Sequence, residues 1–261
     1  MKNPIEDLRK YREFLESIPL EKYREELKDI KWVEQDLPKE ILPLGSIFKH
    51  YWEDREFLDF EKWFEEFWIE INTFPESRKA LEEFKKYFFD RTIEENDWFK
   101  KGFKARMYRT WISILTQLDF CYMFEYVCAK KGIDLQLECN TKLDEKGIDA
   151  MVKDIGFQIA KISQRKEARS GSKKETIITI PYVVFNIDEI KRKINSEKVK
   201  KENKIKYQKM LEAYNKYFIQ LKNGFVVFDE NYIEKIVNHI NDIEKIKDVV
   251  NKIWKELSGE F

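Results

Sequence analysis

The chain has 261 residues, of which 43% are apolar and 15% aromatic, so it can bury one large core or two modest ones and is not a disordered tail protein. Lys and Arg number 49, as do Asp and Glu, which leaves no net charge. No stretch approaches the roughly 18 consecutive apolar residues of a membrane span, and the charged start lacks the apolar segment of a signal peptide. We therefore expect a cytoplasmic protein without a membrane partner.

The zero net charge conceals an asymmetry between two parts of the chain. Residues 1–100 hold 18 basic and 26 acidic residues, whereas residues 101–261 hold 31 and 23. A nucleic-acid partner is expected on the basic part. The sequence thus predicts an acidic, aromatic-rich helical region at 1–100, which packs on the core or dimerises it, and a core with basic elements at 101–261, both within one continuous fold.

The first hundred residues show mostly helical spacing. Apolar residues recur every three or four positions from residue 4 to residue 30, and Pro19 divides this stretch into two helices. An extended connection is expected over residues 31–43, which contain two prolines. From residue 47 to 103, aromatics recur at helical intervals among acids. A base-stacking platform would carry basic residues instead, so this run favours a helical core or a subunit contact.

Residues 100–131 predict one long, mostly apolar helix with Lys104, Arg106 and Arg109 near its start. Cations at a helix N-terminus oppose the helix dipole, which suggests a partner such as phosphate, while ordinary solvated charge is an equally good interpretation. Glu125 lies in the apolar part of this helix. A carboxylate there should be paired or should ligate a metal.

The basic part also predicts short strands. They are expected at residues 147–152, 156–162, 176–185 and 224–228, with Pro181 marking an edge or a bulge. One long basic helix is expected over residues 188–221, and one or two amphipathic helices over 231–257. The predicted fold class is therefore mixed α/β, more closely α+β, with a small mixed sheet surrounded by many helices.

Two polar residues in the predicted strand pair suggest chemistry. Asp149 lies at the start of one strand, and Gln158 follows after a tight turn on the next. A carboxylate and a second oxygen ligand placed in this way can hold a divalent ion and activate a water beside a phosphodiester. The spacing is that of the PD-(D/E)xK nuclease pattern, with Gln158 at the second acid position and with Glu138 and Glu125 as further candidate ligands. The alternative is that Asp149 is simply a turn residue.

The lysine of that pattern is displaced. Its strict position, two residues beyond Gln158, is Ala160, and Lys161 follows it. Side chains alternate along a strand, so Ala160 shares a face with Gln158 and Lys161 does not. Three readings stay open: a bulge re-aims Lys161, the family uses a QxxK pattern, or Ala160 replaces a lysine to give an inactive protein that still binds DNA. Alanine is the usual choice for deleting one side chain, which favours the third.

A flexible basic loop leaves the second strand. It surrounds Ser170-Gly171-Ser172 and is where a phosphate-clamping or groove-reading element would lie, with the candidate contacts Gln164, Arg165, Lys166, Arg169, Lys173 and Lys174. The three cysteines, Cys121, Cys128 and Cys139, lack CxxC spacing, so we expect buried free thiols and no structural zinc.

The chain resembles the TaqI family of type II restriction endonucleases. The resemblance rests on residues 33–38 (VEQDLP), 104–111 (KARMYRTW) and 147–149 (GID) followed by 157–159 (FQI). It implies a Mg²⁺-dependent homodimer that cuts double-stranded DNA at the palindrome TCGA, leaves two-base 5′ overhangs and has a cognate DNA methyltransferase as a genetic partner only. Asp149 would match the catalytic aspartate, and the catalytic lysine would fall at Ala160 or Lys161.

Two rival functions remain on the sequence alone. Another PD-(D/E)xK nuclease, acting in repair, defence or RNA processing, would share the metal site but would not cut at a palindrome. A noncatalytic DNA-binding or interaction module on a degenerate nuclease fold would share only the scaffold, and Ala160 is the residue that favours it.

Overall fold

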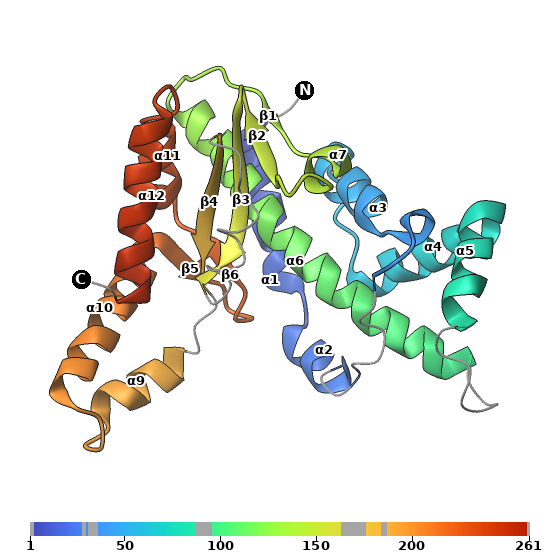
Figure 1. Cartoon of the computed structure of the whole chain (residues 1–261), viewed down its shortest axis with the longest axis horizontal. Coiled ribbons are helices and arrows are strands. Elements are labelled where there is room, and N and C mark those ends of the chain that lie inside the picture. Colours follow the sequence, from blue (N-terminus) through green and yellow to red (C-terminus); the bar gives the residue numbers. More distant parts are fainter. Residues whose placement is uncertain are drawn as a thin grey trace. The chain divides into compact units, whose positions relative to one another are not determined.

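The computed structural model combines helices with a small sheet, as the sequence predicts (Figure 1). It describes residues 3–27, 30, 36–86, 96–162, 176–183 and 187–259. The described chain forms two compact units: a helical unit of residues 11–118, and a sheet unit of residues 1–10 and 119–261. The division falls inside a helix, at residue 118, whereas composition alone placed a boundary near residue 100.

The helical unit contains the helices that precede the four-stranded sheet in the chain, the first and the last of them only in part. Its elements are the C-terminal part of α1 (Pro4–Ser17), α2 (Leu20–Leu27), η1 (Lys39–Ile41), α3 (Leu44–Phe48), the π-helical turn η2 (Lys49–Glu53), α4 (Phe60–Thr73), α5 (Pro75–Lys86) and the N-terminal part of α6 (Asn96–Lys130). Pro19 separates α1 from α2, as predicted. Asp59 begins α4 by accepting a hydrogen bond from the Lys62 backbone N–H at 2.9 Å, a standard N-cap.

Aromatic side chains form the core of the helical unit, as their spacing predicts. Trp111 of α6 is fully buried, and its ring packs against Phe14, Tyr51 and Phe60 with centroid distances of 6.1, 5.9 and 5.3 Å. Tyr11 donates a buried hydrogen bond to the carbonyl of Leu115 at 2.7 Å. The aromatic run is thus a packed helical core and not a stacking platform for bases.

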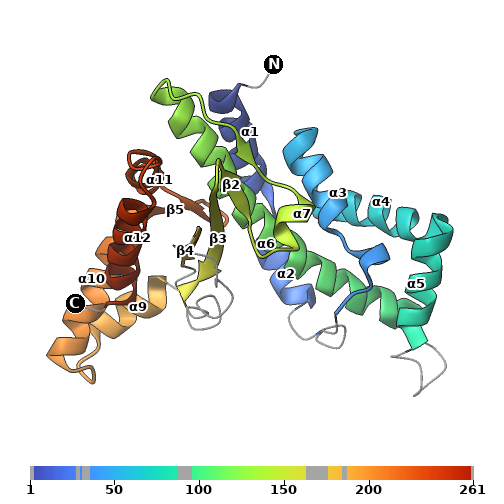
Figure 2. The same ribbon diagram turned by 45° about the horizontal axis from the view of Figure 1, so that its top comes forward.

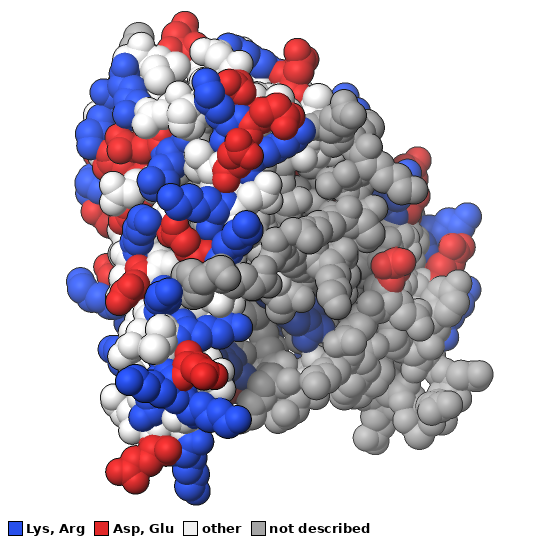
Figure 3. Space-filling model, turned by 60° about the vertical axis from the view of Figure 1, so that its left-hand side comes forward, with Lys and Arg blue, Asp and Glu red and all other residues white. Residues whose placement is uncertain are grey.

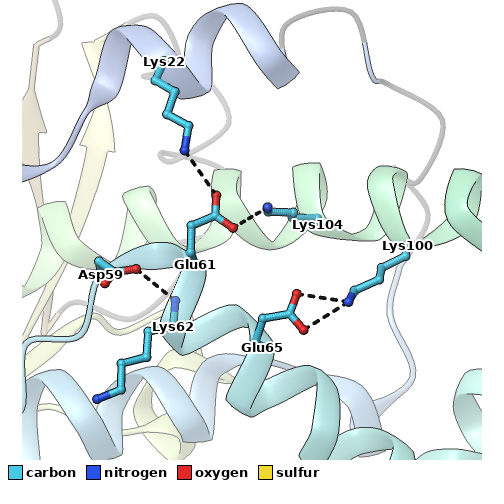
Figure 4. Close-up of polar contacts among 7 residues, drawn as sticks. All are labelled: Lys22, Asp59, Glu61, Lys62, Glu65, Lys100 and Lys104. Atoms are coloured by element: carbon cyan, nitrogen blue, oxygen red, sulfur yellow. Dashed lines mark hydrogen bonds and ion pairs between the residues drawn. The ribbon is translucent and has the colours of Figure 1, made fainter.

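Charged side chains of α4 are paired within this unit. Glu61 accepts from Lys104 and lies 3.9 Å from Lys22, while Glu65 lies 3.0 Å from Lys100 (Figure 4). The Lys104 ammonium also lies within 6.0 Å of the centroids of two buried rings, those of Phe60 and Phe64. Part of the charge of residues 1–100 is therefore neutralised inside the helical unit.

The sheet unit is built on a four-stranded sheet of order β1-β2-β3-β4. Its strands are β1 (Leu137–Glu138), β2 (Ala150–Val152), β3 (Ile155–Lys161) and β4 (Ile177–Tyr182). The first three are antiparallel neighbours, and β4 is parallel to β3, with Gln158 opposite Thr179 and Lys161 opposite Tyr182. Both β3 and β4 therefore end at the same edge (Figures 1 and 2).

One face of the sheet packs on α6. Phe157 points to this face, and its ring lies 5.5 Å from that of Phe120 and 6.0 Å from that of Phe124. Because partners across the strands share a face, Ala150 and Ile178, the partners of Phe157 on β2 and β4, lie on this face, and both are apolar and buried. The opposite face carries Met151, Gly156, Gln158, Ala160 and, on β1, Glu138.

The remaining elements follow β4. They are α9 (Ile187–Asn195), α10 (Lys201–Tyr217), the hairpin of β5 (Phe218–Gln220) with β6 (Val226–Phe228), α11 (Glu230–Val237) and α12 (Ile243–Ser258). The last helix ends at Ser258, and its C-cap residue Gly259 has a φ of 65°, the left-handed conformation that favours glycine. A short α7 (Thr141–Asp144) precedes β2.

The single long helix predicted over residues 188–221 is wrong. The chain breaks after Asn195, where the Ser196 hydroxyl accepts from the Lys198 backbone N–H at 3.3 Å, and the second helix ends at Tyr217 in a strand. Asn and Ser compete with helix by bonding their own backbone. No Pro or Gly marks this break, so helical charge spacing concealed it.

Candidate active site

The candidate catalytic acid, Asp149, lies one residue before β2, where the chain bends. Its backbone N–H donates to the carbonyl of Phe157 at 2.8 Å. Its Oδ2 accepts from the backbone N–H of Ile159 at 2.5 Å, on the side of β3 where a carbonyl of β2 would otherwise bond. The carboxylate thus takes the place of a strand partner. Backbone holds it at the end of the β2–β3 pair that lies away from the connecting turn, and this end is called the mouth of the pair.

Burial dominates the chemistry of this carboxyl group. Asp149 is only 6% exposed. Removal from water raises its pKa to about 7, the hydrogen bond from Ile159 opposes that rise, and the nearby Asp144 adds to it. A nearby cation would favour the ionised form of such a carboxylate, so a strongly shifted carboxyl in a strand mouth is a functional-site candidate.

Gln158 extends toward the same mouth. Gly147, two residues before Asp149, has a φ of 72°, and a Cβ added to it would lie 3.8 Å from the Gln158 amide nitrogen. The amide therefore reaches the turn that leads into Asp149. Gln158 as a whole is half-buried.

The two candidate lysine positions face opposite sides of the sheet. Ala160 is 8% exposed and shares its face with Gln158, whereas Lys161, the last residue of β3, is exposed on the other face. No extra residue interrupts the β3–β4 register, because residues 156–161 pair one to one with 177–182 on β4. A bulge that would re-aim Lys161 is therefore absent from this paired part of β3.

The further candidate ligands lie outside this mouth. Glu138 shares the face of Gln158 but is exposed on the edge strand β1, two strands away and on the order of 10 Å from β3. Glu125 on α6 is half-buried, and its charge helps to raise the pKa values of the Cys121 and Cys128 thiols. Within the described part of the chain, no three His, Cys, Asp or Glu residues are grouped to hold a metal.

Comparison with known proteins identifies the relatives of this chain. The model of the TaqI restriction endonuclease family matches residues 8–240. The type II restriction enzyme TthHB8I of Thermus thermophilus is 34% identical over 248 residues, which cover 89% of this chain and 88% of that enzyme. The chain belongs to the TaqI restriction endonuclease family.

A second relative supports the same assignment. The type II restriction enzyme TaqI of Thermus aquaticus is 35% identical over 244 residues, which cover 88% of this chain and 86% of that enzyme. No solved structure is a significant match to the chain. The resemblance stated from short motifs is thereby confirmed, and it extends over nearly the whole chain.

The predicted DNA contacts of this TaqI-family chain divide into two groups. The loop contacts all lie outside the described residues, namely Gln164, Arg165, Lys166, Arg169, Lys173 and Lys174. The other three lie on α6 in the helical unit. Lys104 pairs with Glu61, Arg109 donates to the carbonyl of Ile30 at 3.0 Å, and the half-buried Arg106 has an Nε without a hydrogen-bond partner among the described residues.

Three residues around Asp149 could not be placed there from the sequence, although Cys121 and Cys139 were correctly expected to be buried free thiols. Cys121 of α6 and Cys139 after β1 are buried free thiols whose side chains are hydrogen bonded, and burial, this bond and the nearby charges of Asp149 and Glu125 raise the pKa of Cys121 well above its usual value. Asp144 of α7 is the third residue, and burial raises its pKa too. These residues come together only through the packing of α6, β1 and α7.

Asp119 was also missed as the buried acid of α6. Its side chain is fully buried and accepts from the Phe228 backbone N–H at 2.7 Å. This bond ties α6 to β6, so the acid has a structural role.

In the described residues, no helix is long and apolar enough to cross a membrane.

Proposed function

We propose that this chain is a type II restriction endonuclease that hydrolyses both strands of double-stranded DNA at TCGA and requires Mg²⁺. The family assignment supports DNA cleavage. The observation that carries the proposal is the buried Asp149 carboxylate at the mouth of the β2–β3 pair, with the Gln158 amide at the turn that leads into Asp149. This is the arrangement of acid and second oxygen ligand that the PD-(D/E)xK pattern describes.

The residues at this mouth fit a magnesium ion. Mg²⁺ commonly keeps several waters and binds one or two protein oxygens together with substrate phosphates. Asp149 supplies a carboxylate that burial has deprived of water, and Gln158 supplies an amide oxygen. When bound, such an ion polarises the scissile phosphate and lowers the pKa of a water.

The chain's own groups have defined roles in this proposal. The Ile159 N–H fixes one Asp149 oxygen, so that the carboxylate cannot rotate away from the mouth. A water attacks the phosphorus, the P–O3′ bond breaks, and the products are a 5′-phosphate and a 3′-hydroxyl. Gln158 would supply the second oxygen ligand beside the phosphate. Lys161 is the lysine nearest in sequence to the lysine position of the PD-(D/E)xK pattern.

A palindromic target implies a two-fold dimer. Each protomer would then place one active site on one strand, because the symmetry of the protein matches that of the site. The cognate DNA methyltransferase remains a genetic partner, which protects the host's own TCGA sites. In this proposal the basic residues predicted between positions 164 and 174 read bases or clamp phosphates, and Arg106 and Arg109 add phosphate contacts.

A plasmid digest tests the proposal. We expect cleavage in Mg²⁺ and none in EDTA, with end mapping that places both cuts within TCGA and leaves 5′ overhangs. Asp149→Asn should lower the rate by about a thousandfold or more, since it removes several kcal/mol of transition-state stabilisation, while binding to the same duplex persists. Cuts scattered over unrelated sequences would instead indicate another nuclease of the superfamily.

A second experiment addresses the lysine position. Ala160 shares the face of Gln158, and this favours a noncatalytic DNA-binding protein as the second candidate function. If Ala160 stands in place of a deleted lysine, the chain should bind TCGA duplexes without cutting them, and Ala160→Lys should restore site-specific cleavage. If Lys161 is used, the chain should cut and Lys161→Ala should abolish cutting. A plasmid left intact by both the chain and Ala160→Lys would favour the degenerate scaffold.

A further inference from the structure

A groove between α10 and α12 is lined mainly by lysines. Its volume is about 510 Å³. The lining residues are Lys209, Glu212, Ala213, Lys216, Lys252, Lys255 and Glu256. Figure 3 views the side of the sheet unit that carries these helices, and lysine and arginine side chains predominate over it toward α9 and α10. The groove is therefore a positively charged concavity on the basic part of the chain.

Only part of this charge is neutralised locally. Glu256 lies 3.1 Å from the Lys216 ammonium and accepts from the Tyr217 hydroxyl at 2.8 Å. Lys252 and Lys255 are exposed, lie three residues apart on the same side of α12, and form no ion pair within the described residues. The acids of the groove thus leave two adjacent ammonium groups available to an external anion.

The groove is extended at one end by another lysine. The Lys206 side chain lies against the C-cap of α12, since a Cβ on Gly259 would meet its Cγ at 2.7 Å and its Cε at 2.8 Å. Lys206 is one turn of α10 before Lys209. Lysines therefore follow one another along both walls, as a rod-shaped polyanion would require and a small anion would not.

The groove is tied to the candidate active site through β4. Trp254, between Lys252 and Lys255, donates from its indole N–H to the carbonyl of Thr179 at 3.0 Å. Thr179 is the register partner of Gln158 on β3. One strand spacing of about 4.8 Å and one helix layer of about 10 Å then separate Gln158 from the groove. That is roughly the length of four base pairs at 3.4 Å each.

We propose that the α10–α12 groove binds the sugar–phosphate backbone of duplex DNA beside the cleaved sequence. This inference rests on the proposed function, because it takes the cleaved duplex as the ligand. The lysines supply affinity that is independent of base sequence, while base recognition belongs to other parts of the chain. The groove thus positions the duplex across the β2–β3 mouth and contributes no group to the reaction.

A matched pair of double variants on α12 tests this inference. K252Q/K255Q removes two charges from the groove. K245Q/K247Q removes two charges from the start of the same helix, where Lys245 and Lys247 are paired with Asp242 and Glu244 of their own helix at 3.0 and 2.7 Å. Both variants change the net charge equally, and thermal unfolding verifies that both are folded.

Binding to two duplexes, one with TCGA and one with a scrambled site, is measured in EDTA from 50 to 200 mM salt. We expect K252Q/K255Q to weaken binding to both duplexes by the same factor. The steepness of log K against log salt should decrease by about 1.8, or about 0.9 per lost phosphate contact. K245Q/K247Q should keep the slope of the unmodified chain.

The outcomes separate the inference from the proposed function. A salt slope of K252Q/K255Q equal to that of the unmodified chain would overturn the groove as a DNA site, while site-specific cleavage by the chain would leave the proposed function standing. Equal losses in the two double variants would also overturn it, since long-range charge would then explain the effect. Failure of the unmodified chain to bind either duplex would overturn both.

Discussion

In the helical unit, acidic side chains of α4 find lysines of the same unit, with Glu61 between Lys22 and Lys104 and Glu65 beside Lys100. In the sheet unit, Asp149 is buried with backbone as its hydrogen-bond donor, and its pKa rises to about 7. The helical unit thus pairs these two acids with its own lysines. The sheet unit keeps a carboxylate whose ionised form would be favoured by an external cation.

This difference separates the construction of a scaffold from that of a site. Rings and ion pairs in the helical unit satisfy one another, so stability is the property that changes when they are removed. At the β2–β3 mouth, burial opposes the ionised form of Asp149 that catalysis would need, as is common at functional sites. Mutations in the two units should therefore change different measurable quantities.

Truncating the central ring of the helical unit should give the largest stability change. Trp111 is fully buried against Phe14, Tyr51 and Phe60. Trp111→Ala should lower the free energy of unfolding by about 3–5 kcal/mol, because a large cavity is left in an aromatic core. Denaturant titration followed by circular dichroism measures the change.

A surface variant of the same unit is the control. Ile69 is 62% exposed, and Ile69→Ala should change the stability by no more than about 0.5 kcal/mol. Cleavage per folded molecule should be unchanged for Ile69→Ala. A loss below about 1 kcal/mol for Trp111→Ala would mean that the aromatic cluster is not the support of this unit.

The second expected effect concerns the pH dependence of the metal-free protein. The Asp149 pKa is about 7 in the folded chain against a usual value of 3.8, so the folded state binds the proton more tightly than the unfolded state. The resulting stabilisation is present below pH 3.8 and is lost as the pH rises to about 7. Its upper bound is about 4 kcal/mol, at 1.36 kcal/mol per pKa unit.

Asp149→Asn isolates this contribution. In EDTA at pH 8 the variant should be more stable than the unmodified chain, since an amide can accept the Ile159 N–H without a buried charge. The difference should vanish near pH 4, and melting curves at several pH values measure it. Asp134→Asn, at an exposed loop position, should show no such trend. A difference that does not depend on pH would contradict the buried, ionisable carboxylate.

The sequence was sufficient to predict much of this comparison. Helical spacing and the proline at position 19 located the first helices, and Gly147 and Gly156 marked the starts of the two predicted strands that carry Asp149 and Gln158. Local signals were strong there because turns and strands are specified by neighbouring residues. The break after Asn195 lacked such a signal, and the long helix predicted across it was wrong.

Contacts between distant elements could not be predicted in the same way. The burial of Asp149 depends on how the chain bends before β2 and on the N–H of Ile159, ten residues away. The meeting of Cys121 with Cys139 depends on the packing of α6 against β1. Position on a strand predicts which residues share a face, but only tertiary packing decides how much water reaches them.

The smallest expected effect is the coupling between Lys104 and Glu61, and it tests the comparison most directly. Lys104 was predicted from sequence as a DNA contact, yet its ammonium lies between Glu61 and two aromatic rings. A double-mutant cycle with Lys104→Met and Glu61→Gln should give a coupling of about 0.5–1 kcal/mol, since the pair is partly shielded from water. The exposed pair Lys193 and Glu189 on α9 is the matched control and should give less.

DNA binding by the same variants decides between the two uses of this lysine. If Lys104 serves the scaffold alone, Lys104→Met should leave the affinity for duplex DNA and its salt slope unchanged. A slope reduced by about 0.9, together with a coupling near zero, would make Lys104 a phosphate contact. The charge of the helical unit would then be directed to the substrate in the way proposed for the α10–α12 groove of the sheet unit.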